Sequence, residues 1–154
     1  MAGRSGESDA RCYHEPPVSD APNLFRMILH VSDTDQAADF YASLLGTAGR
    51  RVAPTRHYFD CGAVILALVD PTGGGETPKT NPDYVYFSVQ DLEALHTRAI
   101  ALGCLSASEV HGKSAGDIVT RPWGERSFYA YDPFGNGLCF VDEQTVFTGR
   151  PRSG

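Results

Sequence analysis

The sequence predicts an α+β fold in which one βαβ(β)β unit occurs twice, and three observations support this prediction. A strand-like segment, a helix cap and an amphipathic helix that ends at glycine follow one another in both halves of the chain. The halves align at a constant offset, because Asp33 of the first cap matches Asp91 of the second, 58 residues later (91 − 33). A segment rich in Gly, Pro and Thr, residues 71–82, separates them. One unit alone is too small to bury both faces of its sheet, so the two units are expected to pair in one domain.

The first unit begins with a predicted strand over residues 25–31, in which every odd position is apolar. Three residues of this strand face the other way: Arg26, Ile28 and His30. Asp33 is suited to cap a helix whose apolar residues recur at helical spacing and which ends at Gly46. Residues 56–60 and 63–69 then predict two strands joined by a tight turn.

The second unit repeats this order. Residues 83–89 predict a strand, Asp91 is suited to cap a helix, and the apolar stripe of that helix ends at Gly103. Two further strands are predicted at residues 126–131 and 137–142, on either side of a turn.

These elements place a single domain at residues 24–147, with module one at 24–80 and module two at 81–147. Residues 1–23 are rich in Gly, Ser, Pro and charge and show no period, so a flexible N-terminal arm is expected there. Residues 148–154 are expected to form a C-terminal tail.

Composition excludes several classes of function. The net charge is -6, and the 13 Lys and Arg residues are scattered, which argues against a nucleic-acid partner. The longest apolar run, residues 63–69, is too short to cross a membrane, and residues 1–20 lack the apolar centre of a secretory signal. The 4 cysteines are widely spaced and form no CxxC pair, so reduced thiols and a cytoplasmic location are expected.

Two local motifs resemble a known superfamily. Val31-Ser32-Asp33, Phe40-Tyr41 and Leu44-Leu45-Gly46 are similar to the "V-x-D…FY…LG" opening of glyoxalase I and bleomycin-resistance proteins. Asp132-Pro133-Phe134-Gly135-Asn136 resembles their closing "DP-x-GN" turn, in which Gly and Asn relieve strain at positive φ. With the internal repeat, the chain resembles the vicinal oxygen chelate superfamily over residues 24–147. The resemblance implies two βαβββ modules whose sheets curl around a ligand cavity, helices outside, often across a homodimer; we therefore expect a homodimer.

The resemblance also implies where a metal would be held. Enzymes of the superfamily usually bind a divalent metal through His and Glu at four positions, which on this sequence are Arg26, Leu66, Tyr84 and Cys139. Arginine cannot ligate a metal, leucine has no donor atom, and a tyrosine with a cysteine does not complete a site. We therefore expect no metal and no other cofactor, which argues against metal-dependent glyoxalase, extradiol dioxygenase and fosfomycin-transferase chemistry.

Strand alternation, together with the superfamily's cavity mouth, predicts an apolar and aromatic pocket with a few polar groups. The ligand-binding residues predicted for it are Arg26, His30, Leu66, Tyr84, Tyr86, Trp123, Glu125, Phe128 and Cys139.

Most of these residues have two interpretations. Arg26 either clamps an anionic group of the ligand or pairs internally, for example with Glu125. His30 is either a general base or a hydrogen-bonded strand histidine. Tyr84 either donates to a ligand oxygen or is a core aromatic. Cys139 is favoured as an inert buried thiol over a nucleophile.

Three functions are compatible with this pocket. The first is a metal-independent binding protein that sequesters an aromatic or anionic small molecule. The alternative is a metal-independent isomerase or lyase that uses His30 or Tyr84 for proton transfer and Arg26 to stabilise an oxyanion. In the third, the pocket is vestigial and the domain acts through dimerisation or a partner. Binding is favoured because no base is paired with an orienting acid, and no residue is assigned a catalytic role.

Overall fold

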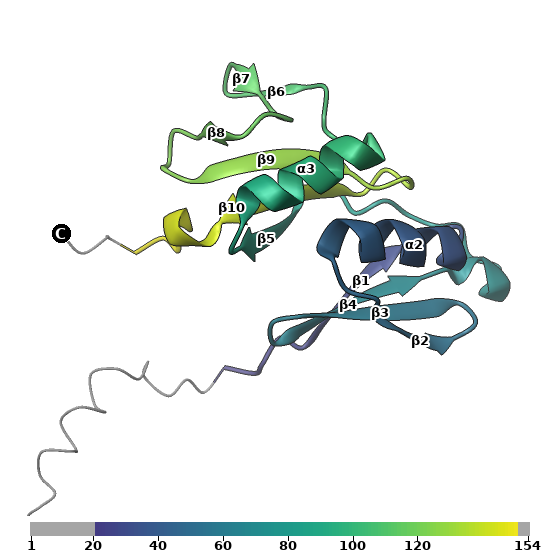
Figure 1. Cartoon of the computed structure of the whole chain (residues 1–154). Coiled ribbons are helices and arrows are strands. Elements are labelled where there is room, and N and C mark those ends of the chain that lie inside the picture. Colours follow the sequence, from purple (N-terminus) through teal and green to yellow (C-terminus); the bar gives the residue numbers. More distant parts are fainter. Residues whose placement is uncertain (1–20, 151–154) are drawn as a thin grey trace, which may run out of the picture.

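A computed structural model describes residues 21–150, so most of the predicted arm and tail lies outside the described residues. The predicted α+β architecture of two βαβββ modules is confirmed (Figure 1). Module one contains β1 (Arg26–His30), α2 (Thr34–Leu45), β2 (Arg50–Ala53), β3 (Arg56–Cys61) and β4 (Val64–Val69), followed by the short helix η1 (Pro71–Gly74). Its sheet has the order β1-β4-β3-β2, with β1 and β4 parallel.

Module two has the same topology with a longer insertion. It contains β5 (Val85–Val89), α3 (Leu92–Leu102), β6 (Glu109–Val110), β7 (Lys113–Ser114), β8 (Val119–Thr120), β9 (Arg126–Tyr131), β10 (Gly137–Asp142) and the short helix η2 (Glu143–Thr145). Its sheet has the order β5-β10-β9-β8, again with the first and last long strands parallel. The sequence did not predict β2 or the short strands β6, β7 and β8.

Both helices begin and end at the predicted residues. Asp33 accepts a hydrogen bond from a backbone N–H of the first turn of α2, and Asp91 does the same for α3. Gly46 and Gly103 end the helices in the left-handed conformation, with φ of 78° and 67°. Local capping chemistry therefore sets the length of each helix.

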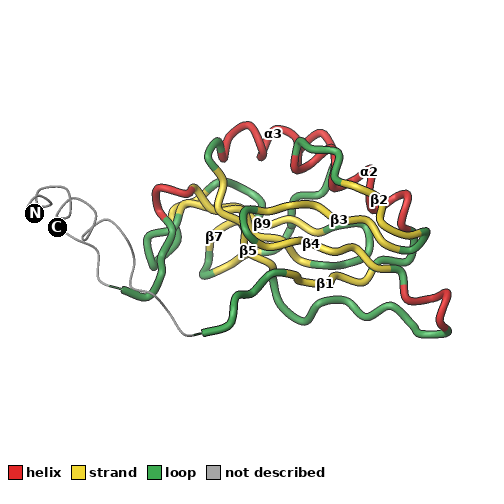
Figure 2. The backbone as a smooth tube through the Cα atoms, turned by 90° about the horizontal axis from the view of Figure 1, so that it is seen from below, coloured by secondary structure: helices red, strands yellow, loops and turns green. Residues whose placement is uncertain are grey.

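The helices lie together on one side of the strands and cover one face of each sheet (Figure 2). Buried residues of both modules form one continuous core between the helices and these faces, and α2 contacts α3. We call the opposite face of each sheet its open face. Within residues 21–150, no helix is both long enough and apolar enough to span a membrane.

The turn between β9 and β10 ties the two modules together. The Tyr41 hydroxyl of α2 donates to Oδ2 of Asp132 at 2.7 Å. Nδ2 of Asn136 donates to the backbone oxygen of His30, at the end of β1, at 3.0 Å. Oδ1 of Asn136 accepts from the backbone N–H of Asn81, in the linker, at 2.9 Å. The turn therefore holds β1 and α2 of module one and the linker, all of which lie far from it in sequence.

The expectation that Asn136 relieves strain at positive φ is wrong. Gly135 has a φ of 89°, but among the described residues His111 is the only non-glycine residue at positive φ. Asn136 is instead fully buried and satisfies a backbone oxygen of module one, at His30, and a backbone N–H of the linker, at Asn81. Its role in the motif is to form hydrogen bonds.

Candidate functional site

Four tyrosines gather on the open face of the second sheet. We call Tyr84, Tyr86, Tyr129 and Tyr131 the tyrosine cluster. Strand pairing places Tyr86, Cys139 and Tyr129 side by side across β5, β10 and β9. The rings of Tyr84 and Tyr129 have centroids 4.7 Å apart, and the hydroxyls of Tyr84 and Tyr131 are 3.0 Å apart. Sequence reasoning predicted the two tyrosines at the start of β5 and missed those of β9, although strand alternation applied to β9 would have found them.

Three tyrosines of the cluster have raised pKa values. The hydrogen bond to Tyr131, helped by burial, raises the pKa of Tyr84 to about 12. Burial also raises the pKa of Tyr86 and that of the deeply buried Tyr129. Tyr86 and Tyr131 remain 55% and 39% exposed. The cluster therefore offers accessible ring surface, and Tyr84, Tyr86 and Tyr129 supply no base at neutral pH.

Cys139 lies beneath this surface. Burial raises the pKa of its thiol to about 12, so a thiolate is scarce at neutral pH. This favours the interpretation of Cys139 as an inert thiol that packs against Tyr129 and Val141.

A pocket of about 480 Å³ opens beside Tyr86, and we call it the aromatic pocket. It is lined by Tyr86, Phe87, Ser88, Trp123, Glu125, Val141, Val146 and Phe147. Nε1 of Trp123 donates to Oε1 of Glu125 at 2.8 Å, and the backbone N–H of Phe147 donates to Oε2 of Glu125 at 2.8 Å. The structure thus brings together three predicted residues, Tyr86, Trp123 and Glu125. It adds Phe147 from the end of the domain, for which the sequence carried no signal.

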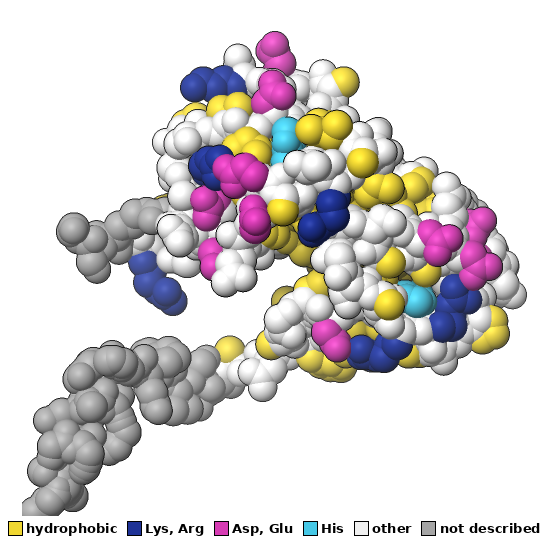
Figure 3. All heavy atoms as spheres, in the orientation of Figure 1, with side chains coloured by type: hydrophobic (Ala, Val, Ile, Leu, Met, Phe, Trp, Pro, Cys, Tyr) yellow, Lys and Arg dark blue, Asp and Glu magenta, His cyan; other side chains and the backbone are white. Residues whose placement is uncertain are grey.

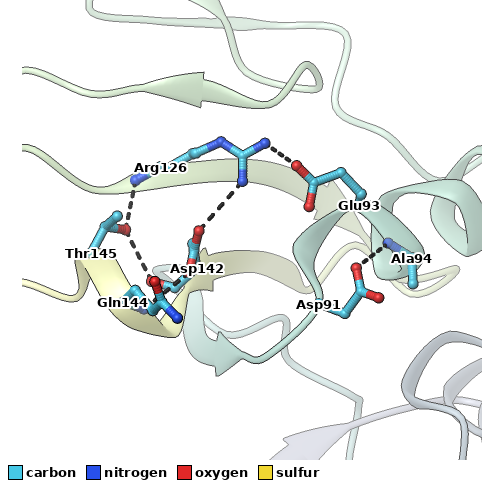
Figure 4. Close-up of polar contacts among 7 residues, drawn as sticks. All are labelled: Asp91, Glu93, Ala94, Arg126, Asp142, Gln144 and Thr145. Carbon is cyan, nitrogen blue, oxygen red and sulfur yellow. Dashed lines mark hydrogen bonds and ion pairs between the residues drawn. The ribbon is translucent and has the colours of Figure 1, made fainter.

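The segment that carries Phe147 is held by a polar network (Figure 4). The backbone N–H of Arg126 in β9 donates to Oγ1 of Thr145 in η2 at 3.0 Å. The guanidinium of Arg126 forms ion pairs with Glu93 of α3 and, at 3.4 Å, with Asp142. Exposed ion pairs contribute little stability individually, but here they fix the short helix directly before Phe147.

A buried arginine that sequence reasoning missed supports the other side of the tyrosine cluster. The guanidinium of Arg121 lies 5.1 Å above the ring of Tyr129. Nε donates to Oγ of Ser127 at 3.1 Å, and the two terminal nitrogens donate to backbone oxygens that include those of Ser114 and Ala115. Arg121 therefore holds the 114–117 segment against the open face.

Arg26 and His30 lie on module one, apart from the aromatic pocket. Arg26 is exposed and stacks on the ring of Phe25, 4.8 Å from its centroid, and no ion pair between Arg26 and Glu125 occurs in the described part of the chain. Nδ1 of His30 accepts a hydrogen bond from the backbone N–H of Lys79 at 3.0 Å. This bond favours the interpretation of His30 as a hydrogen-bonded strand histidine.

Leu66 and Phe128 lie on the faces opposite to the predicted ones. Strand pairing puts Leu66 beside Met27 and Phe128 beside Phe140, so both side chains point into the core under the helices. The residue of β4 beside Arg26 is Ile65. β4 is apolar on both faces, so its sequence carries no alternation from which the face of Leu66 can be predicted. In β9, alternation puts Phe128 on the face opposite to Tyr129 and Tyr131, but aromatic residues on both faces do not show which face meets the core.

A second cavity, of about 690 Å³, lies between the modules on the helix side. Leu66 and Met27 line it from module one, and Val85 and Phe87 line it from module two. Figure 3 shows the hollow between the two lobes, with hydrophobic side chains at its depth. Three residues of β5 line both this cavity and the aromatic pocket: Tyr86, Phe87 and Ser88.

The donor set does not fit the divalent metal that the fold implies. The residue of β4 that pairs with Arg26 is Ile65, one position before the predicted Leu66. Neither Ile65 nor Leu66 has an atom that can bind a metal. Within residues 21–150, no three His, Cys, Asp or Glu residues lie close enough together to hold a metal ion.

The glyoxalase/bleomycin resistance protein/dioxygenase superfamily model matches residues 23–140. Among solved structures, a lactoylglutathione lyase from Agrobacterium tumefaciens is 22% identical, with a TM-score of 0.60 over 84% of this chain and 100% of its own. A glyoxalase/bleomycin resistance protein from Albidiferax ferrireducens T118 is 23% identical, with a TM-score of 0.62 over 77% and 97% of the two chains.

The oxidase ChaP-H1 is 25% identical, with a TM-score of 0.63 over 87% of this chain and 100% of its own. A comparison with curated proteins finds no match. Because the family model spans both modules and the solved structures share their fold, this chain belongs to the glyoxalase/bleomycin resistance protein/dioxygenase superfamily.

Proposed function

We propose that this protein binds a small aromatic molecule without a metal, on the open face of the second sheet. The observation that carries the proposal is the position of Tyr86, whose ring is more than half exposed between the tyrosine cluster and the aromatic pocket. An exposed aromatic ring beside a concave aromatic surface is suited to stack on a flat ligand.

The polar groups around Tyr86 are suited to orient such a ligand. The raised pKa of Tyr84 keeps its hydroxyl protonated at neutral pH, so it can donate to a ligand oxygen or nitrogen, and the Tyr131 hydroxyl lies 3.0 Å from it. The ring of Trp123 faces the pocket, while its N–H is bound to Glu125. A few directed polar groups in an apolar lining are the usual composition of a small-molecule site.

An enzyme remains the second candidate, since a lactoylglutathione lyase and an oxidase share the fold. The geometry favours it less. Among the described residues, no hydrogen bond or ion pair joins Arg26, His30 and Tyr84, the three residues that the isomerase or lyase alternative requires. The raised pKa of Tyr84 also keeps its hydroxyl protonated, so Tyr84 is poorly suited to act as a catalytic base.

We also propose that the protein forms a homodimer and is located in the cytoplasm.

Trp123 is the single tryptophan of the chain, so its fluorescence reports on the aromatic pocket alone. A panel of small aromatic molecules is titrated against the full chain while this fluorescence is recorded. At least one compound is expected to change the signal saturably. Tyr86→Ala should then weaken its affinity by about 1–2 kcal/mol, roughly 5- to 30-fold, because a stacking ring is lost.

Two control variants test whether the effect is local. Tyr58→Ala removes a partly exposed tyrosine from β3 of module one, and Arg26→Met removes the exposed guanidinium of β1. Both are expected to bind like the wild type. The proposal fails if no compound in the panel alters the fluorescence, or if Tyr86→Ala binds as tightly as the wild type. A turnover assay on each bound compound decides between binding and catalysis.

A further inference from the structure

The carboxylate of Glu125 is a buried charge without a counterion. Glu125 is only 8% exposed. Its two hydrogen-bond donors, Trp123 and the backbone of Phe147, are both neutral. None of the ion pairs in the described part of the chain involves Glu125. A buried carboxylate in this state is costly unless a positive group reaches it.

The nearby buried cation does not fill this role. Arg121 approaches Glu125 only through its backbone, whose N–H donates to the backbone oxygen of Glu125 at 2.7 Å. Its guanidinium is directed at Ser127 and at the backbone oxygens of residues 114–117, over the ring of Tyr129. Each oxygen of Glu125 accepts one hydrogen bond and keeps acceptor capacity, so the carboxylate can receive a further donor.

The remaining lining of the pocket matches a positive group as well. The rings of Tyr86, Trp123 and Phe147 line the same pocket as this carboxylate. Aromatic faces attract ammonium groups through the negative charge of their π-systems, and Trp and Tyr do so most strongly. A metal ion is poorly suited, because among the described residues that line the pocket Glu125 is the only carboxylate and no histidine or cysteine accompanies it.

We infer that the ligand bound in the aromatic pocket carries a cationic nitrogen, which the carboxylate of Glu125 and the surrounding aromatic rings recognise. This inference rests on the proposed binding function and specifies the charge of its ligand. It differs from the anionic ligand that Arg26 suggested at the level of sequence, because Arg26 lies on module one and does not line this pocket. The expected ligand class is an aromatic ring that bears a quaternary or protonated amine.

The test compares probes that share a fused two-ring aromatic framework of similar size and differ in charge. We would measure the affinity of 1-methylquinolinium, quinoline and 2-naphthoate for the full-length wild type by titration calorimetry at pH 7. The cation is expected to bind about tenfold more tightly than the neutral ring, and the anion more weakly than either. This series needs no variant, so it does not depend on the folding of a mutant.

Glu125→Gln then removes the charge at constant size. Its matched control is Glu143→Gln, which makes the same change of net charge at an exposed position of η2, outside the pocket. Glu125→Gln should bind the cation and the neutral ring about equally, whereas Glu143→Gln should keep the tenfold preference. Glu125→Gln keeps only one of the two acceptor oxygens, so the N–H of Trp123 or of Phe147 loses its acceptor, and the melting temperature is measured to verify that the variant is folded.

The outcomes separate this inference from the proposed function. Equal affinity of wild type for the cation and the neutral ring, or a preference for 2-naphthoate, would overturn the inference and leave aromatic binding standing. A cation preference that survives in Glu125→Gln would also overturn it. If none of the three probes binds, the inference is overturned as well, and the fluorescence panel decides separately whether the proposed function stands.

Discussion

Replacement of Asn136 tests whether the turn between β9 and β10 holds the two modules together. Asn136 is fully buried, and its side chain serves the backbone oxygen of His30 and the backbone N–H of Asn81. Asn136→Ala takes the side-chain partner away from both of these backbone groups. The Oδ2 atom of Asp132 loses one donor but keeps the hydroxyl of Tyr41.

The expected loss follows from the two backbone groups left without a partner. Each costs about 1–3 kcal/mol, and the lower half of that range applies because both His30 and Asn81 are only partly buried. We expect Asn136→Ala to lower the free energy of unfolding by about 3 kcal/mol, a large share of the 5–15 kcal/mol that is typical of a domain.

Asn136→Asp separates hydrogen bonding from packing, because it conserves the volume. It keeps the acceptor for Asn81 but places an oxygen where Nδ2 lies, 2.9 Å from Oδ2 of Asp132. It should therefore destabilise at least as much as Asn136→Ala. Stability is measured by urea denaturation followed by circular dichroism, with the exposed Asn23→Ala as control. If both Asn136 variants unfold within 1 kcal/mol of the wild type, the reasoning is refuted.

Three further predictions concern pH, metal and assembly. Burial raises the pKa of Cys139 from the ordinary thiol value of 9.0 to about 12 in the folded protein. The contribution of Cys139 to the free energy of unfolding is therefore fully present below pH 9.0 and is lost by about 1.4 kcal/mol per pH unit as the pH rises towards about 12. The free energy of unfolding should fall less steeply with alkaline pH in Cys139→Val than in the wild type, and identical slopes would contradict this. EDTA should leave the melting temperature unchanged and elemental analysis should find no stoichiometric Zn, Ni, Mn or Fe; about one ion per chain would restore a metal site. Light scattering should report a homodimer, since β1 and β5 each leave a sheet edge unpaired, and a monomer at high concentration would count against it.

Much of the fold was predictable because its signals are local. The caps at Asp33 and Asp91 and the left-handed glycines that end both helices act within one turn of the chain, so a short stretch of sequence carries them. The offset of 58 residues between the caps revealed the duplicated module. The short strands of residues 105–120 were missed because stretches of two residues carry no measurable period.

The face of a strand was predictable only where the strand alternates. Arg26 and Tyr86 belong to the edge strands β1 and β5, and alternation along each strand places them on its exposed face. Leu66 belongs to the inner strand β4, which is apolar on both faces, so the sequence pattern does not indicate which face meets the core. In the inner strand β9, alternation separates Phe128 from Tyr129 and Tyr131, but aromatic residues occur on both faces and do not identify the core face. Their orientation is decided by hydrogen bonding to the neighbouring strand.

The candidate site depends on contacts between residues distant in sequence. Phe147 reaches Glu125 across 22 residues, and Tyr41 reaches Asp132 across 91. Composition and periodicity describe each of these segments separately, and they do not indicate which segments lie close together in the folded protein. The repeat, the helix ends and the residue types available to a site therefore follow from the sequence. The buried carboxylate, its aromatic neighbours and the tie between the modules arise only when the packed sheets and helices bring those residues together.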